Sequence, residues 1–410
     1  MPTPIGLTST PTQEILIETA DRRQSAALEL VYFTNRGFSE PESELVPYGA
    51  DRSRALAFGT ATIQLGEGMD WQTLAELSDL EERERQVVIT LKEVEERTRY
   101  PSEPYTMIES DRGLIRAPAV MEQHNAARNQ IHEELKRQTE RAQSGDVLLY
   151  VHGFNETFES AAATLAELCH FLRRRSVCVL FSWPASRGAL LSYTETTETA
   201  EFAVGHLRKA IRAMARSADV ERINLLAHSR GSPLLLSALR ELMITSLASG
   251  EQPTETIKLH HVVLAAPDID VDIAMRKFEL FLSEPDSPVQ WQNDVVPDLI
   301  SGRFTTYLSP GDRALSISSW LFGGGSRVGV LNPLAESESV VAEDIAFLTK
   351  LGMVDVMVYE GERNSFFGHS YFTRDPAVSS DLISLLSSDL RPGSPGRPAT
   401  ELAPSVWSLR

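Results

Sequence analysis

The sequence predicts an α/β fold with a mostly parallel central sheet and helices on both of its faces. From residue 145 onward, short apolar runs rich in β-branched residues alternate with amphipathic helical patterns. The apolar runs are nearly continuous, as in strands that are buried on both faces. One run passes directly into a turn with a serine between small residues, and a helical pattern follows that turn.

This alternation defines the elements of the main part of the chain. Strands are expected at residues 147–152, 177–182, 223–228, 259–266, 304–308 and 354–359. Helices are expected at residues 157–172, 198–216, 230–247, 271–281, 339–350 and 376–390. The first of these helices shows the 3.6-residue period most clearly, with Phe158, Leu165 and Leu172 on one face.

The residues before this alternation carry weaker signals. They predict strands at 28–34, 60–65 and 87–94, a solvated helix at 76–86, a loop at 101–120 and a surface helix at 121–143. We therefore divide the chain into a flexible arm (1–25), N-terminal strands with a helical extension that join the main sheet (26–144), a catalytic core (145–390) and a disordered tail (391–410).

Composition and charge exclude several classes of protein. The 410 residues are 42% hydrophobic and 23% charged, as in an ordinary globular protein. The net charge of −18 opposes binding to nucleic acid or to an anionic membrane surface, because both would repel the chain. No apolar run approaches the roughly 20 residues of a membrane-spanning helix. The oligomeric state is left open by the sequence.

Cys169 and Cys178 are the two cysteines of the chain. Both lie in apolar patterns, so we expect buried, reduced thiols rather than a functional pair. So few cysteines also argue against a disulfide framework or a cysteine zinc site. The first residues lack the charged and apolar segments of a secretory signal, and we expect a cytoplasmic location.

The chemistry is concentrated in the stretch from Ile223 to Gly231, where a strand runs into Ala227-His228-Ser229-Arg230-Gly231. This is the pattern of a nucleophile elbow, with alanine where glycine is more usual. The serine sits on a sharp, strained turn, and small residues two positions before and after it let the strand and the helix approach closely. The helix that follows directs its N–H groups toward developing negative charge.

A second turn, Val151-His152-Gly153-Phe154-Asn155, ends an earlier strand and opens a helix. In folds of this type, the loop after that strand supplies one oxyanion-hole N–H group, and the residue after the nucleophile supplies the other. We assign these donors to Phe154 and Arg230. The simpler alternative is that Gly153 forms only a tight turn and Asn155 only a helix cap.

An acid and a histidine must follow the nucleophile along the chain. The acid most often follows the second strand after the elbow, which favours Asp312 in a Pro-Gly turn; Asp268, after the first strand, is the alternative. His369 is the single histidine beyond either acid, and it follows the last predicted core strand. No metal-ligand spacing such as HExxH occurs, so we expect no metal.

Several short motifs together resemble a bacterial α/β-hydrolase family of unknown function. They are Tyr32-Phe33-Thr34-Asn35-Arg36, Tyr48-Gly49, His152-Gly153-Phe154-Asn155, Phe181-Ser182-Trp183-Pro184, Ala227-His228-Ser229-Arg230-Gly231, Ala266-Pro267-Asp268, Ser309-Pro310-Gly311-Asp312-Arg313-Ala314-Leu315 and Gly368-His369-Ser370. The resemblance implies the α/β-hydrolase fold and a Ser–Asp–His triad at Ser229, Asp312 and His369. It implies no particular substrate.

The chain departs from the family pattern at Arg230, Ser232 and Glu195, where the family more often has Met, Asn and Asp. None of these is a triad member. A cation beside the nucleophile fits an anionic or polar acyl substrate, but a structural salt bridge explains Arg230 equally well. The short connection after residue 266 predicts a small cap that includes Trp291, with help from the loop over residues 184–195.

These features predict a serine hydrolase, most simply a carboxylesterase that acts on a small or medium ester and needs no cofactor. An amidase, thioesterase or acyltransferase would use the same triad. A non-catalytic binding protein with the same fold is the alternative from another class, and the complete order of triad residues argues against it.

Overall fold

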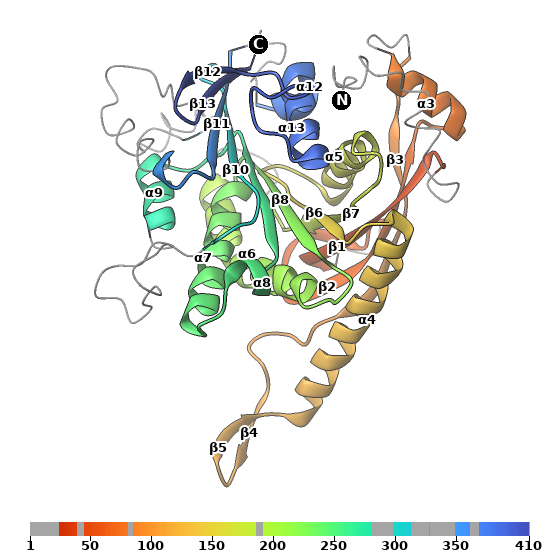
Figure 1. Ribbon diagram of the computed structural model, residues 1–410. Helices are drawn as coiled ribbons and strands as arrows, with labels where there is room; N and C mark the ends of the chain where they lie inside the picture. The colour runs from red at the N-terminus through yellow and green to blue at the C-terminus, as the bar shows by residue number, and fades with distance from the viewer. Residues whose placement is uncertain are drawn as a thin grey trace.

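The computed structural model of the chain describes residues 24–38, 45–80, 85–185, 192–279, 298–312, 328, 349–360 and 369–409. Its central feature is an 11-stranded sheet with the order β12-β13-β11-β10-β9-β8-β6-β7-β1-β2-β3 (Figure 1). The middle of the sheet comes from the middle of the sequence, and its two edges come from the two ends of the chain. The sheet therefore joins the N-terminal strands and the core in one layer.

Most of this sheet is parallel, as the near-continuous apolar runs predict. The parallel strands are β1 (Ala27–Phe38), β6 (Asp146–Val151), β7 (Val177–Ser182), β8 (Arg222–His228), β9 (Leu259–Ala265), β10 (Phe304–Leu308), β11 (Val354–Tyr359) and β13 (Val406–Leu409). Strands β7, β9, β10 and β11 are buried at every position, which is why their sequences do not alternate. The predicted fold class is confirmed.

Antiparallel strands form both edges. Strands β2 (Tyr48–Leu65) and β3 (Ile89–Arg99) follow β1 at one edge, and β12 (Thr400–Ala403) lies beyond β13 at the other. The exposed side chains of β3 alternate with half-buried ones, because one of its faces meets solvent. Its polar sequence is therefore a weaker strand signal than that of the central strands.

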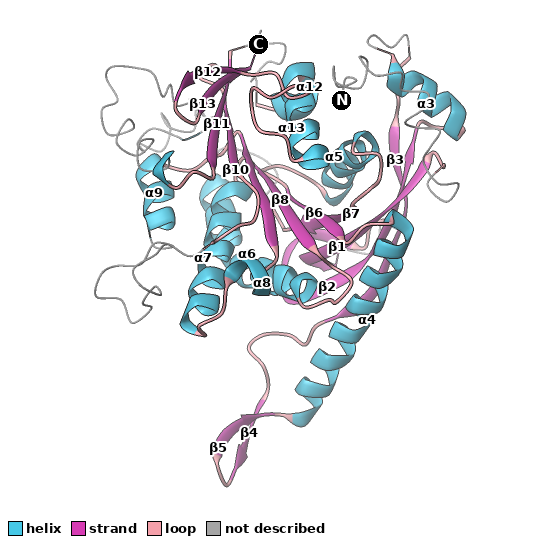
Figure 2. Cartoon of the chain, in the orientation of Figure 1, coloured by secondary structure: helices cyan, strands magenta, loops and turns pink. Residues whose placement is uncertain are grey.

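Helices cover both faces of the sheet (Figure 2). The described helices are α3 (Trp71–Asp79), α4 (Pro118–Ala142), α5 (Phe158–Phe171), α6 (Ser192–Ala215), α7 (Gly231–Ala248), α8 (Pro253–Thr256), α9 (Val271–Glu279), α12 (Tyr371–Arg374) and α13 (Pro376–Ser388). Apolar side chains of α4, α6 and α7 pack in one core cluster with one face of the sheet. Those of α3, α5, α12 and α13 pack in a second cluster with the opposite face.

The loop predicted over residues 101–120 contains a small hairpin, so that prediction was wrong. Strands β4 (Met107–Ser110) and β5 (Gly113–Arg116) pair across a tight turn. Gly113 adopts a positive φ of 97°, and the Ser110 hydroxyl donates to its carbonyl oxygen at 2.8 Å. Figure 1 shows the hairpin at the far end of α4, projecting from the body of the protein.

The tail predicted to be disordered also forms structure, and it completes the sheet. Val406 and Leu409 are buried, and β13 pairs in parallel with β11. Arg397 is fully buried, and its guanidinium group binds both carboxylate oxygens of Asp381 in α13 at 2.9 Å. The alternation in Val406-Trp407-Ser408-Leu409 is too short to stand out after a Pro-, Gly- and Ser-rich stretch.

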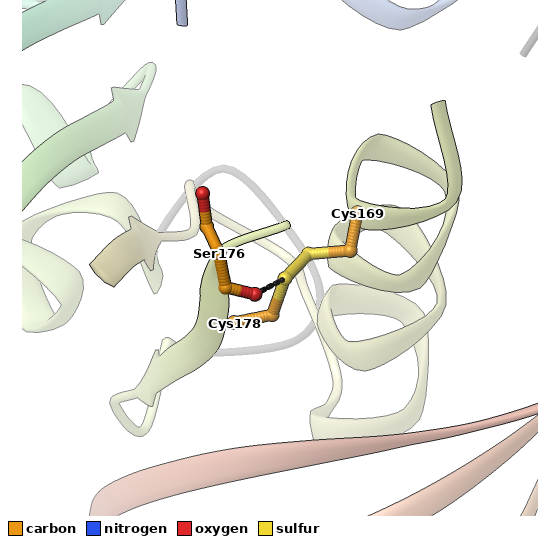
Figure 3. The surroundings of a disulfide bond; sticks show 3 residues. All are labelled: Cys169, Ser176 and Cys178. Atoms are coloured by element: carbon orange, nitrogen blue, oxygen red, sulfur yellow. Dashed lines mark hydrogen bonds between the residues drawn. A yellow bond between two sulfur atoms is a disulfide. The ribbon is translucent and has the colours of Figure 1, made fainter. Parts of the chain in front are cut away.

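The two cysteines form a disulfide rather than reduced thiols, which corrects the prediction from composition. Cys169 in the last turn of α5 and Cys178 in β7 are nine residues apart in sequence, and their Cα atoms are 6.4 Å apart. Figure 3 shows the two sulfur atoms joined between the helix and the strand. The reversal of the chain between α5 and β7 brings the two side chains together, a tertiary effect that an apolar pattern does not reveal.

Some predictions fall outside the described residues. These are nearly all of the arm over residues 1–25, most of the helix over 339–350, and the cap segment with Trp291. Within the described ranges, no helix is both long enough and apolar enough to cross a membrane.

Candidate active site

Ser229 lies between the end of β8 and the start of α7, with a φ of +52°. That left-handed backbone conformation is strained for a residue with a side chain, and surrounding hydrogen bonds hold it in place. The Ser229 N–H donates to the Ala265 oxygen at 3.0 Å, and the Ser229 oxygen accepts from the N–H groups of Ser232 and Asp268 at 3.0 and 3.2 Å. The backbone at Ser229 therefore forms the sharp, strained turn between strand and helix that the sequence pattern predicts.

Small residues are required on two sides of this turn. A Cβ atom on Gly231 would lie 2.6 Å from the backbone oxygens of both Val151 and His152. A Cβ atom on Gly153 would lie 2.9 Å from the Cβ atom of Ser229. The start of α7 and the loop after β6 thus both pack closely at the elbow. Only glycine at positions 231 and 153 allows these segments to lie so close together.

His369 faces the serine from the beginning of the last helical region, just before α12. Its Nε2 atom lies 2.8 Å from the Ser229 Oγ atom, although the two residues are 140 positions apart in sequence. Tyr371, two residues later, donates from its hydroxyl to the Tyr307 oxygen in β10 at 2.8 Å. That bond fixes the start of α12 to the sheet and thereby helps to hold His369 in place.

Asp312 lies on the other side of the histidine. The Asp312 Oδ2 atom is 2.7 Å from the His369 Nδ1 atom, and Asp312 is fully buried. Its N–H donates to the Ser309 oxygen at 3.0 Å, which closes the Pro-Gly turn after β10. With the Nδ1–H group donating to the carboxylate, the Nε2 atom is free to accept the serine proton. The structure brings these predicted residues together in the order Ser, His, Asp.

Asp268, the alternative acid, faces Arg230 instead. Its Oδ2 atom lies 3.9 Å from the Arg230 Nε atom, and both side chains are buried. The Arg230 guanidinium group also donates to the Thr197 hydroxyl in α6 at 2.6 Å and to the Asp268 oxygen at 3.3 Å. Protein groups therefore hold the Arg230 side chain, which favours a structural role for it over a contact with substrate.

The predicted oxyanion donors lie on the two segments that meet at the serine. Arg230 is the N-cap residue of α7, so its N–H group belongs to the positive end of the helix dipole. Phe154 follows Gly153, the residue at which an added Cβ atom would lie 2.9 Å from the Ser229 Cβ atom. The assignment of both N–H groups as oxyanion donors stays a prediction.

The loop that carries Phe154 is anchored through His152, whose role was not predicted. The His152 Nε2 atom accepts from the Trp183 N–H at 3.1 Å, so the ring proton lies on Nδ1, which donates to the Gly153 oxygen at 2.9 Å. Complete burial and the nearby Arg36 cation lower the pKa of His152 to about 3. The ring is therefore neutral and serves as a fixed hydrogen-bonding unit.

Arg36 joins β2, the end of β7 and the loop after β6 around the same histidine. Its buried guanidinium group donates to the Ser182 hydroxyl at 2.8 Å, to the Glu156 oxygen at 2.9 Å and to the Gly49 oxygen at 3.2 Å. One of its nitrogens lies 3.4 Å from the His152 Nε2 atom. The motifs around Arg36 and Trp183 are part of the family resemblance, and their contacts with His152 and Glu156 place them against the loop that carries Phe154.

His228 packs beside the catalytic histidine candidate. Its Nε2–H group donates to the His369 oxygen at 3.3 Å, and its ring also contacts Phe372. Burial, with a smaller contribution from His369, holds the pKa of His228 well below its usual range. A neutral ring here avoids placing a second positive charge next to His369 when that residue takes up a proton.

Among the described residues, His260, His261 and Asp389 form a cluster that could offer three metal ligands. The geometry of His261 does not favour a metal. The Arg303 N–H donates to its Nδ1 atom at 3.0 Å, which places the ring proton on Nε2, the nitrogen that faces Asp389 at 3.0 Å. A protonated nitrogen cannot bind a metal, so a histidine–aspartate pair explains the cluster.

A family model described as an alpha/beta hydrolase of unknown function (DUF900) matches residues 124–386, which include the elbow, Asp312 and His369. No curated protein matches the chain.

Solved structures of low sequence identity also match. A lipase-esterase related protein from Clostridium acetobutylicum ATCC 824 is 12% identical, with a TM-score of 0.30, and the match covers 61% of this chain and 96% of that one. An esterase from Pyrobaculum calidifontis is 13% identical, with a TM-score of 0.30 and 64% and 92% of the chains covered. Phospholipase PlaB from Legionella pneumophila is 13% identical, with a TM-score of 0.20 and 58% and 43% covered.

Proposed function

We propose that this chain, which belongs to the family of alpha/beta hydrolases of unknown function, is a serine hydrolase that cleaves esters through an acyl-enzyme intermediate. One observation carries the proposal. His369 lies between Ser229 and Asp312, with one ring nitrogen 2.8 Å from the serine oxygen and the other 2.7 Å from the carboxylate. This is the geometry that a serine needs in order to lose its proton as it attacks a carbonyl carbon.

The reaction then needs only side chains, backbone N–H groups and water. The Ser229 Oγ atom attacks the ester carbonyl carbon while His369 Nε2 takes the hydroxyl proton. The buried Asp312 carboxylate stabilises the resulting imidazolium, and the N–H groups of Phe154 and Arg230 bind the oxyanion. His369 donates its proton to the leaving alcohol. Water, activated by the same histidine, hydrolyses the acyl-enzyme and restores Ser229.

The full-length protein and its Ser229→Ala variant provide the test, with a fluorophosphonate probe and p-nitrophenyl esters of short and medium chain length. The wild-type chain should be labelled at Ser229 and should hydrolyse at least one ester. The variant should lose the labelling and nearly all turnover, because no other group supplies the nucleophile. Ser237→Ala in α7 is the matched control and should retain both activities.

Two results would contradict the proposal. A wild-type protein that is folded but not labelled would indicate a binding protein rather than a hydrolase. Ester turnover that persists in Ser229→Ala would assign the chemistry to another residue. A parallel panel of ester, thioester and amide substrates ranks the three classes as acyl donors, since all of them share the acyl-enzyme step.

The preference for a small or medium ester follows from the short connection after β9, which predicts a small cap.

The cellular location of the protein is a separate prediction. A disulfide such as Cys169–Cys178 is typical of an oxidising compartment, so the cytoplasmic location suggested by the sequence stays a prediction.

A further inference from the structure

A cavity of about 490 Å³ lies between α4, α6 and the chain segment that connects β3 to β4. Its lining contains none of Ser229, Asp312 and His369. The volume lies within the range of roughly 300–1,000 Å³ that is typical of small-molecule sites. The cavity is therefore a second place on the molecule where a ligand of moderate size fits.

Basic side chains dominate this cavity, although the chain as a whole carries a net charge of −18. The cations in its lining are Arg116, Arg128, Arg208, Lys209, Arg212 and Arg216. Arg208, Arg212 and Arg216 lie four residues apart and so share one face of α6 and its C-terminal end. Glu103 is the one carboxylate among the described lining residues. The cavity is a local exception to the acidic surface.

Two carboxylates at the cavity already have cationic partners. Glu103 forms an ion pair with Lys209, whose ammonium group is also 3.0 Å from the Tyr105 hydroxyl. Glu241 in α7 binds Arg208 at 2.6 Å.

Four guanidinium groups of the lining form no salt bridge with any carboxylate in the described part of the chain. They are those of Arg116, Arg128, Arg212 and Arg216. Each guanidinium group has hydrogen-bond donors arranged in a planar fork, which suits an oxyanion.

The electrostatics of the cavity agree with this geometry. Burial lowers the pKa of His124 in the lining, and the neighbouring cations Lys209, Arg128 and Arg216 lower it further. Burial likewise lowers the pKa of Arg212, with added repulsion from Arg208 and Arg216. The positive charges thus repel one another, and a bound anion would relieve that repulsion.

We propose that this cavity binds a phosphate-bearing anion. A phosphate group offers several charged oxygens, so it can accept from two or more guanidinium groups at once, whereas a single carboxylate engages fewer. The half-buried position of Arg128, Arg208 and Arg212 reduces screening by solvent and strengthens such contacts. The site would work independently of ester hydrolysis at Ser229.

Two sources of phosphate fit this chemistry, a free phosphate ester and a lipid headgroup. The second is suggested by the adjoining hairpin, where Arg116 at the end of β5 belongs to the cavity. Met107, Ile108, Leu114 and Ile115 of the same hairpin are exposed large apolar side chains. Figure 1 shows this hairpin projecting from the body of the protein. A projecting apolar hairpin would be able to contact a membrane surface.

The test measures binding to the full-length protein by isothermal titration calorimetry with inorganic pyrophosphate and with ATP, and by co-sedimentation with vesicles. The vesicles contain phosphatidylglycerol and phosphatidylcholine in equal parts, with pure phosphatidylcholine as the uncharged reference. The pocket variant is Arg212→Gln/Arg216→Gln. The matched control, Arg97→Gln/Arg222→Gln, removes the same charge from β3 and β8, outside the cavity. Circular dichroism and thermal unfolding show that each variant is folded.

We expect the wild type and the control to bind at least one phosphate-bearing probe, and the pocket variant to bind it about tenfold or more weakly, as is usual when charged hydrogen bonds are lost. Binding to pyrophosphate or ATP identifies a free phosphate ester; binding to the anionic vesicles alone identifies a lipid headgroup. The proposal is overturned if no probe binds at millimolar concentration, or if the pocket variant and the control weaken equally, which would indicate a non-specific charge effect.

Discussion

The Trp183 indole N–H donates to the His152 backbone oxygen at 2.8 Å, while the Trp183 backbone N–H donates to the ring of the same histidine at 3.1 Å. The two rings are also stacked, with their centroids 5.6 Å apart. These contacts join the carboxyl ends of β6 and β7. The loop with Phe154 begins at His152, so the contacts of Trp183 fix its starting point.

Replacing Trp183 with Phe tests this positioning role. The ring stack is kept, but the His152 oxygen loses its indole donor, so we expect a stability loss of about 1–3 kcal/mol. We also expect a lower kcat with little change in KM, because the oxyanion donor is needed mainly in the transition state. Trp407→Phe is the control, since no described group accepts from the Trp407 indole. Equal kinetics in both variants would assign Trp183 to packing alone.

The two candidate acids predict different outcomes for matched substitutions. Asp312→Asn should lower kcat by about 10⁴-fold, because the amide favours the wrong tautomer of His369 and cannot stabilise its cation. Asp268→Asn should have a much smaller effect on kcat, because its carboxylate faces Arg230. Steady-state kinetics on the same p-nitrophenyl ester compare the two variants, and the reverse order would transfer the catalytic role to Asp268.

Two helical glycines should respond in opposite ways to alanine. Gly231→Ala introduces a methyl group 2.6 Å from two backbone oxygens, so the elbow must shift. We expect a loss of about 1–3 kcal/mol and of most activity. Gly205→Ala in α6 meets nothing within 4 Å and should be neutral or stabilise by up to about 1 kcal/mol. Urea unfolding measures both effects; similar values for the two variants would contradict the close approach at Gly231.

The pKa of His152 predicts how stability depends on pH. In the unfolded chain this histidine takes up a proton near pH 6.5, but in the folded protein burial lowers its pKa to about 3. Between these values the unfolded state binds more protons, so the free energy of unfolding should fall as the pH falls, by up to about 1.4 kcal/mol per unit for this residue. Urea titrations from pH 7 to pH 4 measure the slope. An NMR resonance of His152 that titrates near pH 6.5 would exclude the buried neutral ring.

The disulfide should stabilise the chain without affecting catalysis. Closing a loop of this length is worth about 2–3 kcal/mol, chiefly through the unfolded state. Thermal unfolding with and without dithiothreitol should show this loss, while the initial rate of ester hydrolysis stays the same. The Cys169→Ser/Cys178→Ser variant should behave like the reduced protein. A wild-type protein that shows two free thiols before any reduction would contradict the disulfide.

The central sheet was predictable because strands such as β7 and β9 are short, apolar and followed by clear helical patterns. The parts that were missed carry weak local signals. The two strands of the hairpin at Met107–Arg116 have only four residues each and are almost entirely exposed, so burial does not shape their sequences. The strand at Val406–Leu409 is short, and its burial comes from strands and helices far away in sequence.

The three residues of the proposed triad could likewise be picked out from chain order, since Ser229, Asp312 and His369 each follow a recognisable strand. The residues that support them were not. Arg36 and Trp183 lie far from Ser229 in sequence, and their role depends on which strands become neighbours in the sheet. Arg230 could be assigned only once Thr197 and Asp268 were seen around its guanidinium group.

The last strands also protect the sheet from other chains. Strand β11 has hydrogen-bonding partners on both sides only because β13 lies beside it, and the sheet then ends in β12, which has four residues. A short outer strand offers little for a foreign strand to pair with. Removal of residues after 398 would expose the edge of β11 from Val356 to Tyr359, a segment whose side chains are apolar or aromatic and buried in the intact fold. Such a truncated chain would be prone to edge-to-edge aggregation even with the proposed catalytic residues intact.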